Sequence, residues 1–343
     1  MIKNTSILLI YTGGTIGMIN ETGSNALIPF SLEEIIKHAP ELGKFGFNIS
    51  SVTFDNPVDS SDINPDTWKK IAGIIEKNYE NYDGFVVLHG TDTMAYSASA
   101  LSFMFENLGK PVIFTGSQLP ISSIRTDARE NLMSSIEIAA AKNNGDSLVP
   151  EVCIYFEFKL LRGNRTTKIN ADNFNAFHSP NYPPLAESGV HIKYNTEDIQ
   201  YPVKDSPFKV NKSMDPNLAV LKIFPGITEN TVDSVLNSKN LRAVILETFG
   251  AGNAPTEPWF GERIKSAVNR GIIILNITQC SQGRVEMGRY ETSKHLVDAG
   301  VISGFDMTSE AAITKLMFLL GLYNSTEKIK LLLNNSLNGE ITV

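Results

Sequence analysis

Short runs of aliphatic and β-branched residues alternate with helical patterns along almost the whole chain, and this alternation restricts the fold more than any other feature. Each run is bounded by turn residues and is too short for a helix. Runs of this kind are typical of strands that are buried on both faces, as the strands of parallel sheets are. The runs lie at residues 7–11, 84–90, 111–116, 152–158, 218–226, 242–250 and 271–278.

Helical patterns with start signals separate these runs. Ser31 and Glu34 form a capping box, and Asn64 is a cap followed by Pro65 at the first helical position. The segments DTMAYSASALSFMFENLG and TSEAAITKLMFLLG carry small and apolar residues at helical spacing, and we expect the first of them to stop at Gly109. The alternation therefore predicts α/β architecture with mostly parallel sheets flanked by helices.

A polar stretch with three prolines interrupts the alternation after about residue 193. Domain boundaries fall in such segments, and the 343 residues of the chain exceed the ~250–300 at which a single core stops growing. We therefore expect a larger N-terminal α/β domain over residues 1–195 and a linker over residues 196–216. A smaller C-terminal α/β domain with a parallel sheet is expected over residues 217–343.

The charge of the chain is acidic, with a net charge of −7 and a pI of about 5.4. This balance argues against a nucleic-acid-binding surface and gives no basic patch for anionic membranes. The apolar runs fall short of the ~18 residues of a membrane span, and the N-terminal run is too short for a signal peptide. We expect a cytoplasmic protein that binds neither nucleic acid nor membrane.

The cysteines and histidines show no spacing typical of a disulfide or a metal site. Cys153 and Cys280 lie within apolar runs, so we expect two buried, inert thiols. His89 ends a predicted strand and is expected to be a core histidine bonded to backbone rather than a catalyst. No metal is predicted.

Four predicted strand ends carry hydroxyls, carboxylates and glycines, at residues 12–15, 59–62, 89–93 and 115–118. In open α/β sheets, ligands bind beyond the carboxyl ends of the strands. One such end alone would be an ordinary turn. The four together predict a polar pocket for a small ligand.

The first of these ends, Thr-Gly-Gly-Thr, does not match a nucleotide-binding loop, because its glycines have the wrong spacing and no phosphate-binding lysine follows. One interpretation is a tight turn that lets backbone approach a small ligand while a threonine hydroxyl projects into the pocket. The other is a strand-end turn whose hydroxyls bond only to backbone. Taken alone, this loop fits either.

The segment HGTDTM places Thr91 and Asp92 at the mouth of a predicted helix, where backbone amides can stabilise an oxyanion and Asp92 can hold an ammonium group. Thr93 fits an ordinary helix cap. In the segment RGNRTTK, Arg162 and Arg165 are expected to be solvated, whereas Lys168 could act as a base if it lies against Thr91 and Asp92. A Ser-His-Asp hydrolase is disfavoured, because the chain has no Gly-x-Ser-x-Gly elbow.

The segments TGGTIGM and GFVVLHGTDTM together resemble the two signatures of the bacterial L-asparaginase/glutaminase family. The segments DSSDINPDTW, FTGSQLP, RGNRTTK, FGAGNAP and DMTSEAAITKL are similar to the cytosolic type I asparaginases. The resemblance covers essentially the whole chain. It implies hydrolysis of L-asparagine to L-aspartate and ammonia without a cofactor.

The resemblance also implies roles for residues at matching positions. Thr15 is the expected nucleophile, and Thr91, Asp92 and Lys168 form a second, triad-like set. The residues expected to bind substrate are Asp59, Ser60, Ser61, Gly90 and Ser117, of which Ser117 lines the carboxamide pocket. A covalent aspartyl ester on Thr15 is the expected intermediate, although which of Thr15 and Thr91 attacks first stays open.

The sequence departs from the family pattern at one position. Many relatives carry a tyrosine on the loop after TGGT that helps to activate the nucleophile, whereas Leu27 stands there in this chain. The loop at residues 18–28 still fits a flexible lid. The resemblance further implies a homodimer or homotetramer in which Asn253 of a neighbouring subunit completes the site, although Asn253 also fits a helix cap.

Three alternatives remain open. A glutaminase-asparaginase or an amidotransferase-associated amidase would share this fold, because rejecting glutamine means rejecting a single methylene. A catalytically silent amino-acid sensor would explain the missing tyrosine. A nucleotide-binding protein is disfavoured by the glycine spacing.

Overall fold

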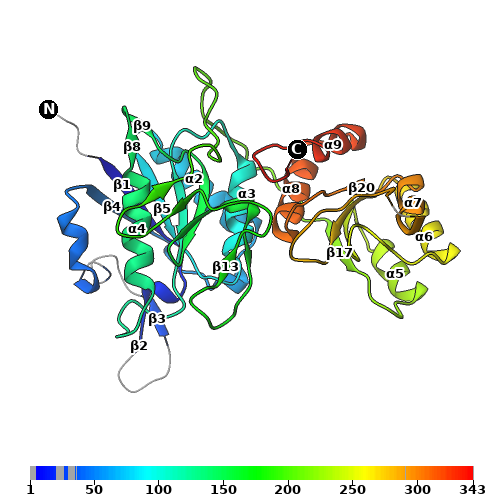
Figure 1. The fold of residues 1–343 in the computed structure, drawn as a ribbon, viewed down its shortest axis with the longest axis horizontal. Helices are drawn as coiled ribbons and strands as arrows, with labels where there is room; N and C mark the ends of the chain where they lie inside the picture. Colours follow the sequence, from blue (N-terminus) through cyan, green and yellow to red (C-terminus); the bar gives the residue numbers. More distant parts are fainter. Residues whose placement is uncertain (1–4, 21–26, 30–34, 36, 290, 343) are drawn as a thin grey trace. The chain divides into compact units, whose positions relative to one another are not determined.

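The computed structural model describes residues 5–20, 27–29, 35, 37–289 and 291–342. The chain divides into two compact units, Met1–Lys212 and Ser213–Val343, which are drawn in blue to green and in green to red in Figure 1. The first unit includes β16 (Lys209–Val210), which pairs with β6 (Phe105–Glu106). Residues 196–212, part of the predicted linker, therefore lie within this unit.

The first unit is built on an eight-stranded sheet with the order β15-β14-β11-β10-β7-β5-β1-β4. The strands from β4 to β10 run parallel, and those from β10 to β15 pair antiparallel. A mostly parallel sheet was expected, and this is confirmed. The strand bounds are β1 Ser6–Tyr11, β4 Asn48–Thr53, β5 Gly84–Leu88, β7 Val112–Thr115, β10 Val152–Phe156, β11 Lys159–Arg162, β14 Ala186–Glu187 and β15 Lys193–Tyr194.

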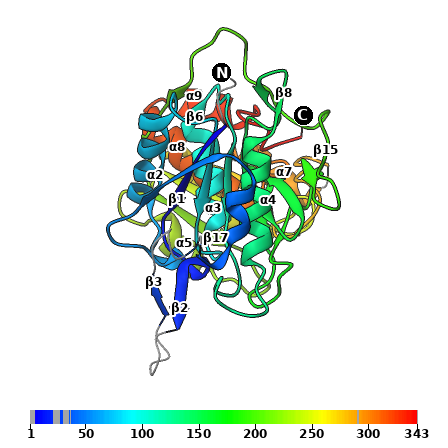
Figure 2. The same cartoon turned by 90° about the vertical axis from the view of Figure 1, so that its left-hand side faces the viewer.

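Both faces of the central strands are buried, because successive side chains of a strand point to opposite faces. On one face, Leu9, Val86 and Ile113 join a core with residues of α4 (Ala128–Ala140). On the other face, the ring of Phe85 stacks on that of Tyr79, which follows α2 (Pro65–Asn78). Figure 2 shows α2 and α4 on opposite sides of the sheet.

The helix signals had mixed outcomes. The Asn64 side chain accepts from the amides of Asp66 and Thr67, so the predicted cap of α2 is confirmed. The expectation that the next helix stops at Gly109 is wrong, because α3 (Met94–Met104) ends where β6 begins. The predicted capping box at residues 31 and 34 lies outside the described residues.

Short elements complete the first unit and connect its strands. The 3-10 helices are η1 Thr15–Gly17, η2 Pro40–Lys44, η3 Ser60–Asp62 and η4 Gly163–Arg165. The paired short strands are β2 Met18–Asn20 with β3 Leu27–Pro29, β8 Lys142–Asn143 with β9 Asp146–Ser147, and β12 Thr167–Lys168 with β13 Phe177–His178.

The second unit contains a parallel sheet with the order β17-β18-β19-β20, as expected for the C-terminal α/β part. Its strands are β17 Leu218–Lys222, β18 Ala243–Thr248, β19 Ile273–Thr278 and β20 Ile302–Ser303. Its helices are α5 Glu229–Leu236, α6 Pro258–Asn269, α7 Glu291–Asp298, α8 Ser309–Leu322 and α9 Thr326–Leu333. The C-terminal segment is tied to α8 by an ion pair between Lys315 and Glu340, whose side chains are fully buried.

Two expectations about charge and burial are wrong. Arg162 is buried rather than solvated, because its guanidinium pairs with Glu151 at 2.6 Å and lies over the Tyr182 ring; Arg165 is buried beside the same ring. Cys280 is exposed, because β19 ends before it, whereas Cys153 is buried as expected.

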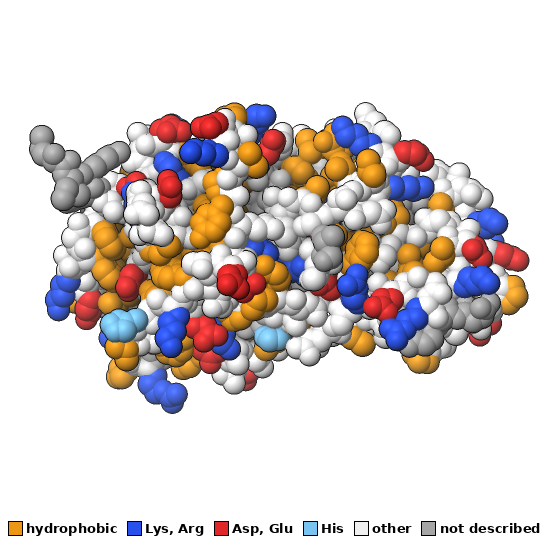
Figure 3. Space-filling view, turned by 45° about the horizontal axis from the view of Figure 1, so that its top comes forward, with side chains coloured by type: hydrophobic (Ala, Val, Ile, Leu, Met, Phe, Trp, Pro, Cys, Tyr) orange, Lys and Arg blue, Asp and Glu red, His pale blue; other side chains and the backbone are white. Residues whose placement is uncertain are grey.

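The surface carries charges of both signs. On the face shown in Figure 3, lysine and arginine side chains are interspersed with aspartate and glutamate among the residues drawn in colour. Within the described ranges, no helix is both long enough and apolar enough to span a membrane.

Candidate active site

Glycines allow the predicted strand ends to pack directly against one another. Gly14, after β1, has a φ of 90°, and a Cβ there would overlap the amide nitrogen of Gly90, after β5. A Cβ on Gly90 would lie 2.6 Å from the hydroxyl oxygen of Ser60, and one on Gly116 would overlap the carbonyl oxygen of His89. Four strand ends therefore meet at the carboxyl edge of the sheet, which is where a ligand is expected in this architecture.

The two threonines of the first loop occupy different environments. The Thr12 hydroxyl is buried and donates to the Leu88 carbonyl at 3.0 Å, so it closes the strand end. Thr15 is half-buried and begins η1. The Tyr11 hydroxyl donates to the Gly17 carbonyl at 3.1 Å and holds the other end of this turn. Burial raises the pKa of Tyr11 to about 12, so this hydroxyl keeps its proton.

Lys168 lies against Thr91 and Asp92. Its Nζ is 2.8 Å from Thr91 Oγ1 and 2.6 Å from Asp92 Oδ1, and its side chain is 15% exposed whereas that of Asp92 is 64% exposed. The ammonium reaches the third strand end, residues 89–93, from β12, which is a separate short strand. A hydroxyl, a carboxylate and an amine thus form one contact group at the carboxyl edge of the sheet.

Asp59 and Ser60 follow β4 and begin η3. The Asp59 carboxylate accepts from the Ser61 backbone amide and from the Ser61 hydroxyl, each at 2.8 Å, and these two bonds lower its pKa. Ser60 is buried beside Gly90, and its carbonyl accepts from the Thr93 hydroxyl at 2.6 Å. Thr93 therefore joins two strand ends. The prediction that its side chain caps the helix is wrong, because it makes no cap hydrogen bond to α3.

The fourth strand end contributes a residue that sequence reasoning did not select. The Thr91 hydroxyl donates to Gln118 Oε1 at 3.3 Å, and the Gln118 amide donates to the carbonyls of Ala171 and Asn173. The neighbouring Ser117 hydroxyl is buried and donates to the Leu119 carbonyl at 2.6 Å. Gln118 was visible in the sequence as the residue after Ser117.

Asp127 fixes this loop from the start of α4. Its carboxylate accepts from the backbone amides of Gln118 and Leu119 and from the Asn131 side chain. Burial raises its pKa, although the two amides act in the opposite direction. No sequence signal marks Asp127, because its partners lie in a turn that the pattern does not resolve.

Asn253 lies in the second unit, in a tight turn between β18 and α6. Its backbone forms an isolated bridge with Phe249, and Gly250 and Gly252 take positive φ values. The Asn253 side chain accepts from the Thr292 hydroxyl at 2.7 Å, whereas Glu257 holds the cap position of α6. The helix-cap interpretation of Asn253 is therefore wrong.

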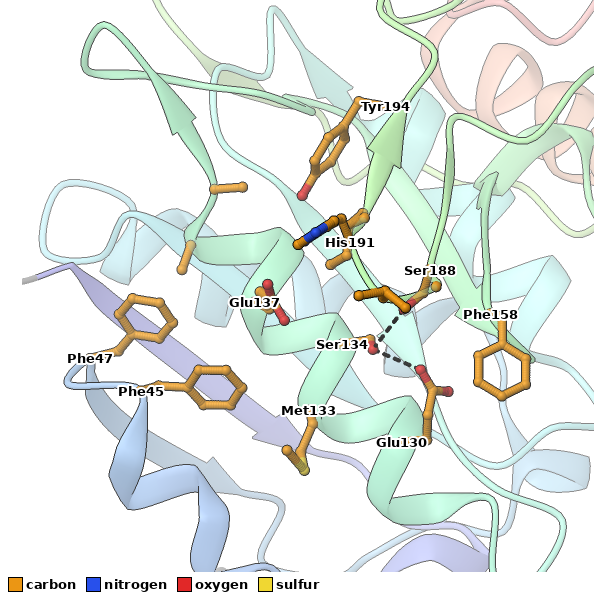
Figure 4. Close-up of a pocket in the computed structure, with 15 residues that line it drawn as sticks. Phe45, Phe47, Glu130, Met133, Ser134, Glu137, Phe158, Ser188, His191 and Tyr194 are labelled. Carbon is orange, nitrogen blue, oxygen red and sulfur yellow. Dashed lines mark hydrogen bonds between the residues drawn. The ribbon is translucent and has the colours of Figure 1, made fainter.

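Two concavities of the first unit are lined by residues other than Thr91, Asp92 and Lys168. A groove of about 1160 Å³ runs along the outer side of α4, and Figure 4 shows Phe45 and Phe47 facing Met133 across it, with His191 and Tyr194 on the opposite wall. It contains none of the predicted site residues. A smaller cavity of about 660 Å³ adjoins Gln118 and residues 171–174. Over the described ranges, His, Cys, Asp and Glu form no group of three that could hold a metal ion.

The carboxyl edge of the sheet has the components that acyl transfer from an amide requires. These are a half-buried hydroxyl on a tight turn, a second hydroxyl in contact with an amine, two carboxylates and backbone amides at the start of a helix. The predicted site residues of the first unit all lie on the loops at this edge or on β12. They are Thr15, Asp59, Ser60, Ser61, Gly90, Thr91, Asp92, Ser117 and Lys168.

Family models match nearly the whole chain. The model described as "Asparaginase, N-terminal" matches residues 6–200, and the model described as "Glutaminase/Asparaginase C-terminal domain" matches residues 217–333.

Individual proteins also match this chain over nearly its whole length. L-asparaginase 1 of Escherichia coli K12 is 43% identical, over 99% of each chain. The crystal structure of L-asparaginase I from Vibrio cholerae is 44% identical and superposes with a TM-score of 0.90, over 99% of this chain and all of that one. The 60 kDa lysophospholipase of Mus musculus is 42% identical over 98% of this chain, which spans 62% of the mouse protein.

Proposed function

Because this chain belongs to the asparaginase family, we propose that it hydrolyses L-asparagine to L-aspartate and ammonia in the cytoplasm. The observation that carries the proposal is the contact of Lys168 with both Thr91 and Asp92, at the strand edge where Thr15 lies on the adjoining loop. These groups supply a nucleophile and a proton acceptor for amide cleavage.

The reaction has two steps in this proposal. The Thr15 oxygen bonds to the side-chain carbonyl carbon of asparagine, the carbon–nitrogen bond breaks, and ammonia leaves with the hydroxyl proton. Water then cleaves the resulting aspartyl ester, which releases aspartate and returns a proton to Thr15. In this proposal, backbone amides near Thr91 stabilise the oxyanion of each step.

The substrate zwitterion needs anchors of both charges. The ionised Asp59 carboxylate suits the α-ammonium, and the Ser60 and Ser61 hydroxyls and the Gly90 amide suit the α-carboxylate. Ser117 lines the part of the pocket that holds the side-chain carboxamide of the substrate in this proposal. In a homodimer or homotetramer, Asn253 of a neighbouring subunit would complete this pocket.

Leu27 favours one alternative. It lies in β3, whose backbone pairs with β2, and its side chain is outside the described part of the chain. If no group replaces the tyrosine of many relatives, the protein would bind amino acids without turning them over. A broader glutaminase-asparaginase is the other alternative, because one methylene changes recognition by only ~1–3 kcal/mol.

Ammonia release from L-asparagine and from L-glutamine, each over a wide concentration range, tests the proposal. We expect kcat/KM for asparagine to exceed that for glutamine by about 10-fold or more. Equal values would make the protein a glutaminase-asparaginase. Tight aspartate binding in calorimetry with no ammonia from either amide would make it a sensor.

A further inference from the structure

A buried histidine stands directly before the catalytic loop. His89 follows β5, its side chain is 1% exposed, and each of its ring nitrogens has one partner. Nδ1 lies 2.7 Å from the carbonyl oxygen of Gly90, and Nε2 lies 2.9 Å from the hydroxyl oxygen of Ser97 on α3. The same hydroxyl accepts from the Trp68 indole N–H on α2 at 2.9 Å.

These contacts determine where the imidazole carries its proton. A carbonyl oxygen can only accept, so the Nδ1 that faces Gly90 must be the donor. Because Ser97 accepts from Trp68, its own hydrogen is available for Nε2. Burial lowers the pKa of His89 to about 4, so the ring is neutral with its proton on Nδ1. The hydrogen bonds run in one direction, from Trp68 through Ser97 and His89 to Gly90.

The Gly90 carbonyl ends this series of hydrogen bonds, and the backbone around it is closely packed against the other loops of the site. Gly90 contacts Gly14 of the Thr15 loop and Ser60 of η3, and the preceding carbonyl, that of His89, contacts Gly116. The next two residues are Thr91 and Asp92. A rotation of the peptide between Gly90 and Thr91 would move the partners of Lys168 and press the backbone against the Thr15 loop.

We propose that His89 is a positioning residue for the amidohydrolase reaction: Trp68 and Ser97 hold its ring through Nε2, so that its Nδ1 proton holds the Gly90 carbonyl and sets the direction of Thr91 and Asp92. This rests on the proposed function, and it assigns roles to two residues, Trp68 and Ser97, that lie outside the strand-end loops. His89 itself transfers no proton to substrate.

Substitutions in the full-length protein test this role. In Ser97→Ala the ring loses its donor at Nε2 and with it the contact that holds the imidazole in place, so the Nδ1–H bond to the Gly90 carbonyl should weaken. We expect kcat to fall by about 10-fold with KM changed by less than about 2-fold, because the bond acts on transition-state geometry. Trp68→Phe keeps the Ser97 donor and should lose less. Ser102→Ala is the matched control, because that hydroxyl donates to the Ala98 carbonyl of the same helix.

Nitrogen-15 chemical shifts of labelled histidine give a readout that does not depend on turnover. We expect wild-type His89, assigned as the signal that is lost in His89→Gln, to carry its proton on Nδ1 with Nε2 in a hydrogen bond. In Ser97→Ala the Nε2 shift should move toward that of an unbonded ring nitrogen. A wild-type Nε2–H form, or wild-type kcat in Ser97→Ala, would overturn the positioning role. A wild-type protein that releases no ammonia would instead overturn the proposed function, and the shifts would still decide the hydrogen-bond chain.

Discussion

The ammonium nitrogen of Lys168 lies 2.8 Å from the hydroxyl oxygen of Thr91, although the two residues are 77 positions apart in the chain. The short β12–β13 pair places the lysine there, because β12 ends at Lys168 and its backbone is paired with Phe177. The contact with Asp92 balances the charge of the ammonium. The Thr91 hydroxyl therefore accepts from Lys168 while its own hydrogen is directed to Gln118 Oε1.

Removal of the Lys168 ammonium should abolish most turnover. In Lys168→Met the Thr91 hydroxyl loses its charged partner, while the aliphatic part of the side chain is preserved. We expect kcat for asparagine to fall by about 10²–10⁴-fold, the usual contribution of a positioned acid–base group. Lys168→Arg keeps the charge but cannot lose a proton, so it should be nearly as inactive. An active Lys168→Arg would limit Lys168 to a charge-balancing role.

Replacement of Thr15 tests the nucleophile directly. Thr15→Val is nearly isosteric and should lower ammonia release by about 10³-fold or more with an unchanged circular dichroism spectrum. Thr12→Val is an informative comparison, because the Thr12 hydroxyl bonds to backbone and should matter for stability rather than for chemistry. If Thr15→Val turns over asparagine at the wild-type rate, Thr91 becomes the candidate nucleophile.

The sequence predicts the strand edge well but not all the contacts that form on it. Hydrophobic periodicity and turn residues place β1, β5 and β7 and the polar loops after them, because burial on both faces leaves a clear local pattern. The position of Lys168 is different. It depends on a strand pair beyond η4, so the sequence pattern gives the contact with Thr91 and Asp92 only as a condition, and the resemblance to a family groups the three residues.

Long-range pairing also explains the expectations that failed. Arg162 was expected in solvent, because the polar segment that contains it does not indicate that the β10–β11 hairpin brings its guanidinium to the Glu151 carboxylate. The helix α3 ends earlier than predicted, because the backbone of Glu106 pairs with that of Lys209, about a hundred residues further along the chain. Local propensity cannot report either contact.

The acid side of the pH profile should depend on Ser61. Its amide and hydroxyl lower the pKa of Asp59, so this carboxylate stays ionised, and able to hold the substrate ammonium, to lower pH than an ordinary aspartate. Ser61→Ala removes the hydroxyl and raises that pKa. The midpoint of the acid limb of kcat/KM should therefore move to higher pH. The plateau above the limb should fall as well, because the Ser61 hydroxyl is also assigned to the substrate α-carboxylate. Ser234→Ala, on the surface of α5, should leave the limb in place. An unmoved limb in Ser61→Ala would exclude Asp59 as the titrating anchor.

The buried pair of Lys315 and Glu340 should control the stability of the second unit. Both side chains are fully buried, and Lys315 also donates to the carbonyl of Asn335 at 2.7 Å. Lys315→Met leaves the Glu340 carboxylate uncompensated, which should cost about 3–5 kcal/mol in free energy of unfolding. Urea unfolding followed by Trp259 fluorescence in a Trp68→Phe background reports on this unit alone, because the chain has only these two tryptophans.

Two further variants separate the buried charge from the loss of a lysine. Lys69→Met breaks an exposed pair with Asp66 and should cost less than about 1 kcal/mol. The double variant Lys315→Met/Glu340→Gln removes both charges and keeps an acceptor for the amides of Leu337 and Asn338, so it should recover most of the lost stability. If the double variant is as unstable as Lys315→Met, the cost lies in lost packing and lost hydrogen bonds of the lysine rather than in the unpaired carboxylate.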